Sequence, residues 1–188
     1  MYRYVFIALF AAAAATTSTA TVAAAPAHDA TAGDPASAIY GSETLDLADD
    51  WGTASACIEL GAVTECFDTE ADLLAAHAEA RSVDRSIGVT RGVAAASSIT
   101  CSSSLRMYDG NSYTGGILYL NTRGVTHNLS SFGFDNVTSS YRVGGCSASF
   151  FSSPNLGGSF YPGYTGAWAQ SPSMAAGWNN VVSSVYIY

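Results

Sequence analysis

The C-terminal stretch WNNVVSSVYIY (178–188) places two amide side chains and two hydroxyl groups within six residues. Asn179-Asn180 precede Ser183-Ser184, and Asx residues followed two or three positions later by Ser surround a tight turn with side-chain and carbonyl oxygens. This set offers oxygen and no ligating nitrogen, which suits Ca²⁺ better than Zn²⁺ or copper. The stretch therefore predicts either half of a calcium site or an Asx/Ser turn that binds no ion.

The same pattern occurs once more, in FDNVTSSYRV (134–143). There Asp135-Asn136 precede Ser139-Ser140, and Phe134 stands where the later copy has Trp178. The copies are 44 residues apart, measured from Ser139 to Ser183. Two copies in one chain favour a cation site over a chance turn.

A second feature precedes the first in each copy. The stretches YDGNSYTGG (108–116) and FSSPNLGGS (151–159) share an aromatic, four residues, a second apolar residue and X-Gly. Their glycines, Gly115 and Gly158, are 43 residues apart, and a glycine supplies the positive φ that a folded-back turn needs. Two features that recur in one order at nearly one offset indicate a duplicated structural unit.

The chain from Cys101 onward has the residue pattern of an all-β domain. Short runs such as LRMY, ILYL, SYRV, ASFF and VYIY are rich in β-branched and aromatic residues, and Gly, Asn, Ser and Pro clusters separate them. Such spacing predicts a sandwich or barrel.

Together these features resemble the βγ-crystallin Greek-key motif, over residues 101–188. The family pattern is an aromatic, four residues, an aromatic, X and Gly, followed by Asx-Asx-X-X-Ser/Thr-Ser; Leu156 departs from it at the second aromatic. The resemblance implies a two-sheet Greek-key sandwich of two motifs and eight strands.

The resemblance also implies two Ca²⁺ sites, each built by both motifs. It assigns hydroxyl ligands to Ser139 and Ser183 and carbonyl ligands to Val137 and Val181, and a carbonyl from each folded hairpin would complete the shell. The residues of the two Asx pairs either supply side-chain oxygens to the ion or hold the loops in shape; they are Asp135, Asn136, Asn179 and Asn180. Because only Asp135 is charged, we expect a dissociation constant of roughly 10⁻⁵ to 10⁻³ M.

The front half divides into four predicted segments. Residues 1–25, with Arg3, an apolar run and Ala-X-Ala spacing, are typical of a signal peptide. Residues 26–50 are predicted to be an acidic linker, 51–82 a small hairpin–helix unit with Thr69 and Asp72 capping the helix, and 83–100 a second linker. We therefore expect a secreted protein with no membrane span in its mature form.

The four cysteines have the spacing of disulfides in an exported protein. Cys57 and Cys66 flank Gly61 in ACIELGAVTECF and fit the base of a stapled hairpin, which leaves Cys101 to pair with Cys146. Other pairings stay open, because sequence alone does not fix connectivity.

Charge and motif content limit the function. The chain has no Lys, and thirteen of its fifteen carboxylates lie between residues 26 and 100, so no basic stripe for nucleic acid is present. No GxSxG or HExxH motif occurs, and nothing supports a triad from His127 and Asp135. We expect a non-catalytic, monomeric calcium-binding protein.

Two alternatives remain. The first is an inhibitor of an extracellular metalloproteinase, also of crystallin-like fold, for which the loop 163–178 offers Trp168 and Met174 as anchors unless Trp168 packs into the core. Against it, the domain has no short local disulfide to brace that loop. The second is a secreted toxin or cell-wall or glycan-binding protein.

Overall fold

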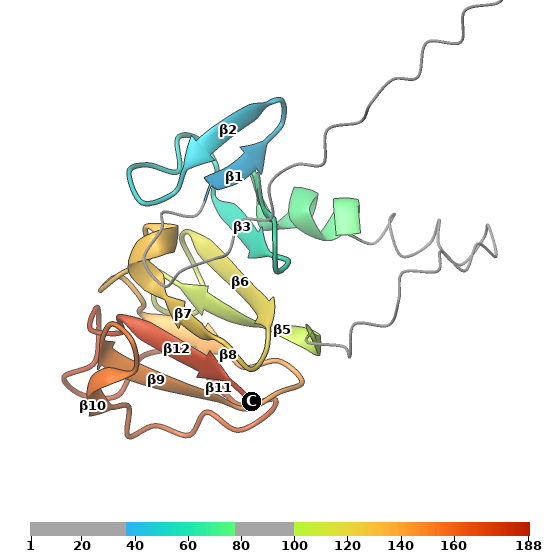
Figure 1. Cartoon of the computed structure of the whole chain (residues 1–188). Coiled ribbons are helices and arrows are strands. Elements are labelled where there is room, and N and C mark those ends of the chain that lie inside the picture. Colours follow the sequence, from blue (N-terminus) through green and yellow to red (C-terminus); the bar gives the residue numbers. More distant parts are fainter. Residues whose placement is uncertain (1–36, 78–99) are drawn as a thin grey trace, which may run out of the picture.

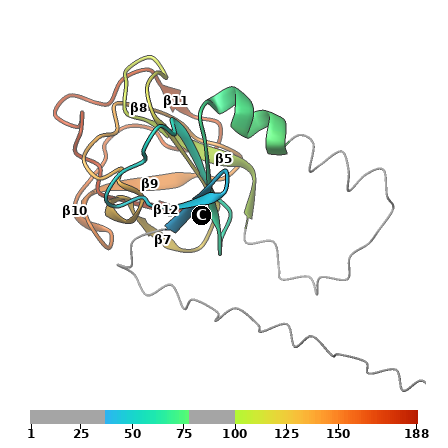
Figure 2. The same ribbon diagram turned by 90° about the horizontal axis from the view of Figure 1, so that it is seen from above.

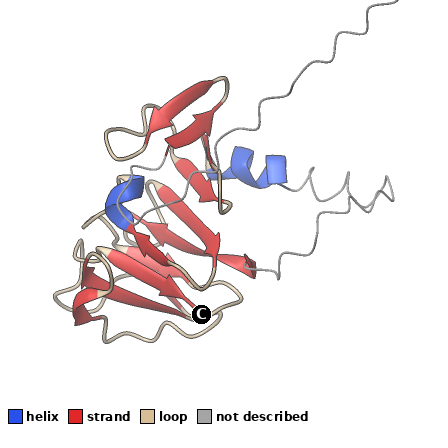
Figure 3. Ribbon diagram, viewed as in Figure 1, coloured by secondary structure: helices blue, strands red, loops and turns tan. Residues whose placement is uncertain are grey.

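The computed structural model describes residues 37–77 and 100–188. The predicted signal peptide, residues 1–25, and residues 83–99 of the second linker lie outside the described residues. Strands make up most of the regular structure, and helix is confined to short segments (Figure 3). The prediction of an all-β, two-sheet fold is confirmed.

Eight strands form the two Greek-key motifs of residues 100–188. The first motif contains β5 (Thr100–Tyr108), β6 (Ile117–Thr122), β7 (Thr126–Asn128) and β8 (Ser140–Arg142), with a 3-10 helix, η1 (Leu129–Phe132), after β7. The second contains β9 (Ala148–Ser153), β10 (Gly157–Phe160), β11 (Gln170–Ser171) and β12 (Ser184–Ile187). Figure 1 shows these strands in the lower part of the molecule.

Each motif gives its third strand to the sheet of the other. Thus β11 pairs with β8 at the end of the first sheet, and β7 pairs with β12 at the end of the second, whose order is β10-β9-β12-β7. Because of this exchange, neither motif completes its own sheet. The segments that precede β8 and β12 lie side by side, joined by backbone hydrogen bonds.

The main core lies between the two sheets. Alternating side chains of β5 and β6 point into it, among them Leu105, Met107, Leu118 and Leu120, and from the second sheet Phe150 does so as well. The intervening residues of β6, Ile117 and Tyr119, lie on the outer face of the first sheet in a second apolar cluster. This is why the run ILYL is buried throughout, although strands alternate their faces.

The N-terminal residues extend the first sheet, which differs from the prediction of an acidic linker over 26–50. Residues 37–46 form a hairpin of β1 (Ser37–Tyr40) and β2 (Glu43–Asp46), and β1 runs parallel to β4. Its acidic side chains face solvent, while Ala38 and Leu47 are fully buried in the main core. Two apolar anchors thus suffice to dock a segment whose average composition is that of a linker.

The predicted hairpin–helix unit is present, but it is part of the same sheet and not a separate body. Its strands are β3 (Ala56–Glu59) and β4 (Thr64–Phe67), and β3 pairs in parallel with β6. The first sheet therefore has eight strands in the order β11-β8-β5-β6-β3-β4-β1-β2. Pairing with β3 covers an edge of β6 that would otherwise present free backbone groups.

A buried carboxylate fixes this extension to the first motif. Glu59, at the end of β3, is 5% exposed. Its side-chain oxygens accept hydrogen bonds from the backbone nitrogens of Asn121 (3.1 Å) and Thr122 (3.0 Å) in β6, and from the Thr122 hydroxyl. Four donors in all, including the Gly61 nitrogen, satisfy a charge that would be costly to bury alone.

The helix after β4 covers the outer face of the first sheet, near β3 and β5 (Figures 1 and 2). It begins at Glu70 and is described to His77, and the Thr69 hydroxyl caps it by accepting from the Asp72 nitrogen at 3.2 Å, as predicted. Leu73 is buried and Leu74 exposed. The Tyr119 hydroxyl donates to Glu70, and burial together with this bond raises the pKa of Tyr119 above its ordinary value.

Both predicted disulfides are formed. Cys57–Cys66 joins β3 to β4, and Cys101–Cys146 joins the start of β5 to the segment before β9. Among the described residues, no helix has the length and apolar character needed to cross a membrane.

Candidate metal site

The two Asx-Ser loops lie face to face and bond to each other through their backbones. The Asn136 nitrogen donates to the Val182 carbonyl at 3.0 Å, and the Asn180 nitrogen donates to the Thr138 carbonyl at 3.0 Å. Each loop thus makes with its partner the same bond that the partner makes with it, as an internal two-fold repeat requires. The structure therefore brings together the two halves of the sequence signature.

The side chains are also paired across the loops. The Ser139 hydroxyl donates to Asn180 Oδ1 at 3.0 Å, and the Ser183 hydroxyl donates to Asn136 Oδ1 at 3.3 Å. We call the first pair the Ser139 clamp and the second the Ser183 clamp. Each clamp takes its hydroxyl from one motif and its amide oxygen from the other.

The second Asx residue of each pair reaches across because of its backbone. Asn136 and Asn180 both have φ of 57°, in the left-handed region that Asn tolerates better than most residues. The first Asx residue of the earlier copy behaves differently: Asp135 accepts a hydrogen bond from Nδ2 of its own neighbour, Asn136, at 2.9 Å. The geometry thus assigns Asn136 and Asn180 to the clamps, a choice that the sequence left open.

Several oxygen atoms in the two loops accept no hydrogen bond from the described residues and could therefore accept a further partner. Asp135 Oδ1 and the Thr138 hydroxyl are buried and have no hydrogen-bond partner among the described residues. The carbonyls of Val137 and Val181 accept no backbone hydrogen bond from a described residue. Buried side-chain oxygens such as Asp135 Oδ1 and the Thr138 hydroxyl are normally satisfied, and a bound cation would be one partner for them. The donor set is all oxygen, with one carboxylate, and fits a hard cation.

The last serine of each signature has a structural role that sequence reasoning missed. Ser140 donates to the Gly110 carbonyl at 2.6 Å and accepts from the Tyr113 nitrogen at 3.0 Å. In the other motif, Ser184 makes the equivalent bonds to the Ser153 carbonyl (2.6 Å) and the Leu156 nitrogen (3.0 Å). These two residues, the hairpin serines, fasten the folded hairpins, and their repeated position next to Ser139 and Ser183 was the available signal.

The folded hairpins themselves have matching backbones. Ser112 and Tyr113 in one, and Asn155 and Leu156 in the other, have φ between 56° and 64°. The rings of Tyr108 and Tyr113 meet edge to face, 5.6 Å apart. Leu156 cannot make that contact, but the hairpin serine holds it in the same way, so the departure from the motif leaves the turn intact.

We predict that replacing a hairpin serine with alanine destabilises the protein whether or not calcium is present. In Ser184→Ala the part-buried Leu156 nitrogen loses its acceptor and the Ser153 carbonyl loses its donor, which together cost about 1–2 kcal/mol in the free energy of unfolding. Denaturant unfolding in chelator and in Ca²⁺ should give the same loss. Ser173→Ala, at an exposed position, is the control; a stability loss in Ca²⁺ alone would instead make Ser184 part of the ion site.

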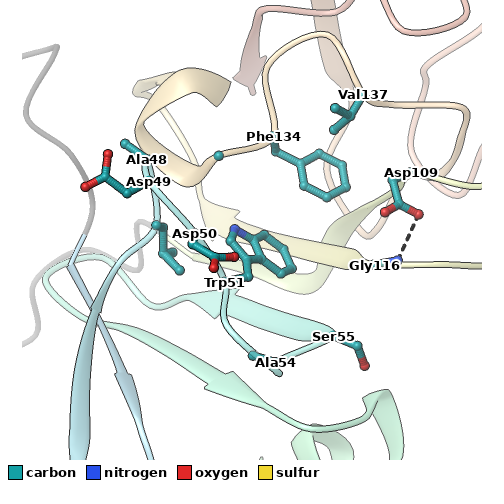
Figure 4. Close-up of a pocket in the computed structure, with 12 residues that line it drawn as sticks. Ala48, Asp49, Asp50, Trp51, Ala54, Ser55, Asp109, Gly116, Phe134 and Val137 are labelled. Carbon is teal, nitrogen blue, oxygen red and sulfur yellow. Dashed lines mark hydrogen bonds between the residues drawn. The ribbon is translucent and has the colours of Figure 1, made fainter.

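A pocket of about 420 Å³ lies beside the first loop, between that loop and the N-terminal extension (Figure 4). Trp51 and Phe134 stack across it, 5.5 Å apart, and the Trp51 indole donates to the Phe132 carbonyl at 2.7 Å. Val137 also lines the pocket. The extension therefore supports the segment that carries the first signature.

Other residues singled out in the sequence are placed differently from expectation. His127 lies in β7, buried, with Nε2 2.8 Å from the Thr122 carbonyl. Trp168 does not enter the core: it is 66% exposed, and its φ is 66°. Met174 is 8% exposed and is not a surface anchor. The loop 163–178 thus presents one of its two predicted anchors.

Comparisons with known proteins give structural matches only. No family model and no curated protein matches the chain. Among solved structures, it is similar to a βγ-crystallin domain from Clostridium beijerinckii (22% identity, TM-score 0.38), which covers 46% of this chain and 98% of that one. A βγ-crystallin from Ciona intestinalis (19%, TM-score 0.39) covers 46% and 100%. One from Flavobacterium johnsoniae (25%, TM-score 0.35) covers 45% and 92%. The solved structures to which about half of this chain is similar are thus βγ-crystallin domains, and that is the family its two signatures resemble.

Proposed function

We propose that this is a secreted, non-catalytic calcium-binding protein in which two ions bind at the Ser139 and Ser183 clamps and stabilise the fold. The observation that carries the proposal is the reciprocal pairing of hydroxyl and amide oxygens across the two loops, at 3.0 and 3.3 Å. Two disulfides in the described part of the chain are consistent with an oxidising compartment.

The chemistry of the loops favours Ca²⁺ over smaller or softer ions. The available ligands are hydroxyl, amide, carboxylate and carbonyl oxygens, and Ca²⁺ accepts six to eight such ligands in flexible arrangements. Mg²⁺ demands near-ideal octahedral geometry and gives up its waters reluctantly. Among the described residues, no group of three or more His, Cys, Asp or Glu is placed to hold a metal, which leaves the Asx-Ser loops as the candidate.

The proposed role of the ion is to join the two motifs. Each clamp takes one side chain from each motif, so a bound ion would bridge segments that are 41 and 47 residues apart in sequence. It would also replace the present hydrogen bond in each clamp by ligation of both oxygens. Since an ion that binds only the folded state stabilises it by mass action, calcium would raise the stability of the whole domain.

We predict a higher melting temperature of the full chain in Ca²⁺. At a dissociation constant of about 10⁻⁴ M, about 10 mM Ca²⁺ is a hundredfold excess, worth about 2.7 kcal/mol per site. For a protein of this size that corresponds to a rise of roughly 5–10 °C per site. The measurement is a thermal melt in chelator, in Ca²⁺ and in Mg²⁺.

The matched control is the double variant Ser139→Ala, Ser183→Ala, which removes both hydroxyls and leaves the hairpin serines in place. The rise of its melting temperature in Ca²⁺ over chelator should be clearly smaller than that of the wild type, because both sites are weakened. If the wild-type protein melts at the same temperature in all three conditions, the loops are turns that bind no ion, and the proposal is wrong. An equal rise in Mg²⁺ would remove its calcium selectivity.

A further inference from the structure

A groove of about 630 Å³ lies beside the second motif, and no clamp residue lines it. It is formed by the loop that follows β10 and by β11, at the edge of the first sheet where β11 pairs with β8. Its floor contains Tyr141 and Tyr161. The volume lies in the range of sites that bind small molecules.

An exposed tyrosine stands in the wall of this groove and is held in place from beneath. Tyr164 is 79% exposed. Its ring packs on Gly166, where an added Cβ would come within 2.4 Å of the ring, and its carbonyl accepts from the Tyr141 hydroxyl at 3.0 Å. The hydroxyl end of the ring thus lies close to Gly166, and most of the side chain remains exposed.

Trp168 adds a second exposed ring, one residue before Ala169, which lines the groove. Its left-handed φ of 66° is uncommon and strained for a large side chain. The strained residue is fixed by a hydrogen bond from its nitrogen to the Gly144 carbonyl at 2.9 Å. Backbone strain that displays a large apolar side chain to solvent is of a kind found at binding sites.

The polar lining of the groove carries no formal charge. Among the described residues that line it, none is Asp, Glu, Lys, Arg or His, and the polar side chains are amide or hydroxyl groups, such as Gln170, Ser171 and Ser173. Arg142, the neighbour of Tyr141 in β8, points elsewhere: its guanidinium lies 3.9 Å from the centre of the Tyr113 ring. A neutral ligand with many hydroxyl groups matches this lining, since amides and hydroxyls both donate and accept.

We propose that this groove binds an uncharged oligosaccharide, with Tyr164 stacking on the apolar face of a sugar ring and Gln170 and Ser171 bonding to its hydroxyl groups. Tyr and Trp offer rigid, amphipathic contact area at a low cost in conformational entropy, which suits a sugar with one apolar face and a polar rim. The proposal stands independently of the calcium sites, because no clamp residue lines the groove.

The test is binding of the full, disulfide-intact chain to insoluble cellulose and chitin by co-sedimentation, with tryptophan fluorescence titrations by cellohexaose and chitohexaose. Tyr164→Ala should weaken binding at least about tenfold, as expected for an aromatic anchor, and Gln170→Ala should weaken it as well. The matched control is Phe160→Ala, which removes another exposed aromatic, in β10. Melting temperatures measured alongside should stay unchanged for Tyr164→Ala, since the side chain is exposed.

Binding to cellulose, chitin or either oligosaccharide that falls in Tyr164→Ala but not in Phe160→Ala would support the proposal. No binding to any of these probes would overturn it, and so would binding that survives Tyr164→Ala. Equal binding to the charged polysaccharide alginate would show attraction without the proposed selectivity and would also overturn it. So would inhibition of a metalloproteinase that is lost in Trp168→Ala, because the loop would then serve a protein partner.

Discussion

Replacing Ser139 with alanine is expected to remove one of two bound calcium ions and leave the other in place. The Ser139 clamp loses its hydroxyl, while the Ser183 clamp keeps both oxygens, because Ser183 pairs with Asn136 and not with Asn180. Isothermal titration calorimetry should show the stoichiometry falling from two to one. The lost site should be weakened at least about tenfold, since one ligand of a weak site is missing.

Paired variants test whether each site is shared between motifs. Ser139→Ala with Asn180→Ala changes one clamp only and should still bind one ion. Ser139→Ala with Asn136→Ala changes two residues of one loop but one from each clamp, and should bind none. If instead the second pair keeps one ion and the first keeps none, each site is built within a single loop, and the crosswise assignment is wrong.

Replacing Glu59 with alanine is expected to cost about 3 kcal/mol or more in the free energy of unfolding. The change leaves the buried nitrogens of Asn121 and Thr122 and the Thr122 hydroxyl without an acceptor, and each unsatisfied buried group costs about 1–3 kcal/mol. Glu59→Gln should cost less, because it keeps one oxygen. Equilibrium denaturation measures both.

The location of this loss is as informative as its size. Amide hydrogen exchange of Asn121 and Thr122 should quicken in Glu59→Ala more than exchange in β9, because the carboxylate joins β3 to β6 and does not reach the second sheet. Glu43→Ala, an exposed carboxylate in β2, is the control. An unfolding free energy equal to that of the wild type would mean that β3–β6 backbone pairing alone holds the extension.

The fold of residues 101–188 could be predicted from the sequence because short local motifs specify its turns and because each motif occurs twice. The glycine and serine positions of each motif specify turns, and their recurrence at nearly equal offsets shows that the two loops occupy equivalent places. Which Asx residue enters a clamp could not be predicted. That choice depends on the positive φ of Asn136 and Asn180 and on the loop each one faces, and neither is encoded in the signature itself.

The extension was mispredicted for a different reason. In residues 37–46 the strands are four residues long and largely exposed, so their acidic composition outweighs any period of two. Tertiary contacts hold these strands in place: Ala38 and Leu47 enter a core made by residues far along the chain. The exposure of Trp168 could not be predicted from the sequence either, since a large apolar residue is expected to be buried.

The parallel pairing of β3 with β6 also sets an order of events during synthesis. Residue 57 meets residue 118 in that register, so the β3–β4 hairpin emerges first and must wait for its partner strand. Until β6 arrives, one edge of β3 is open, and an open edge is a template for pairing with a second chain. Contacts of such long sequence separation also slow folding. Slower synthesis of the segment between β4 and β6 should therefore favour aggregation over folding.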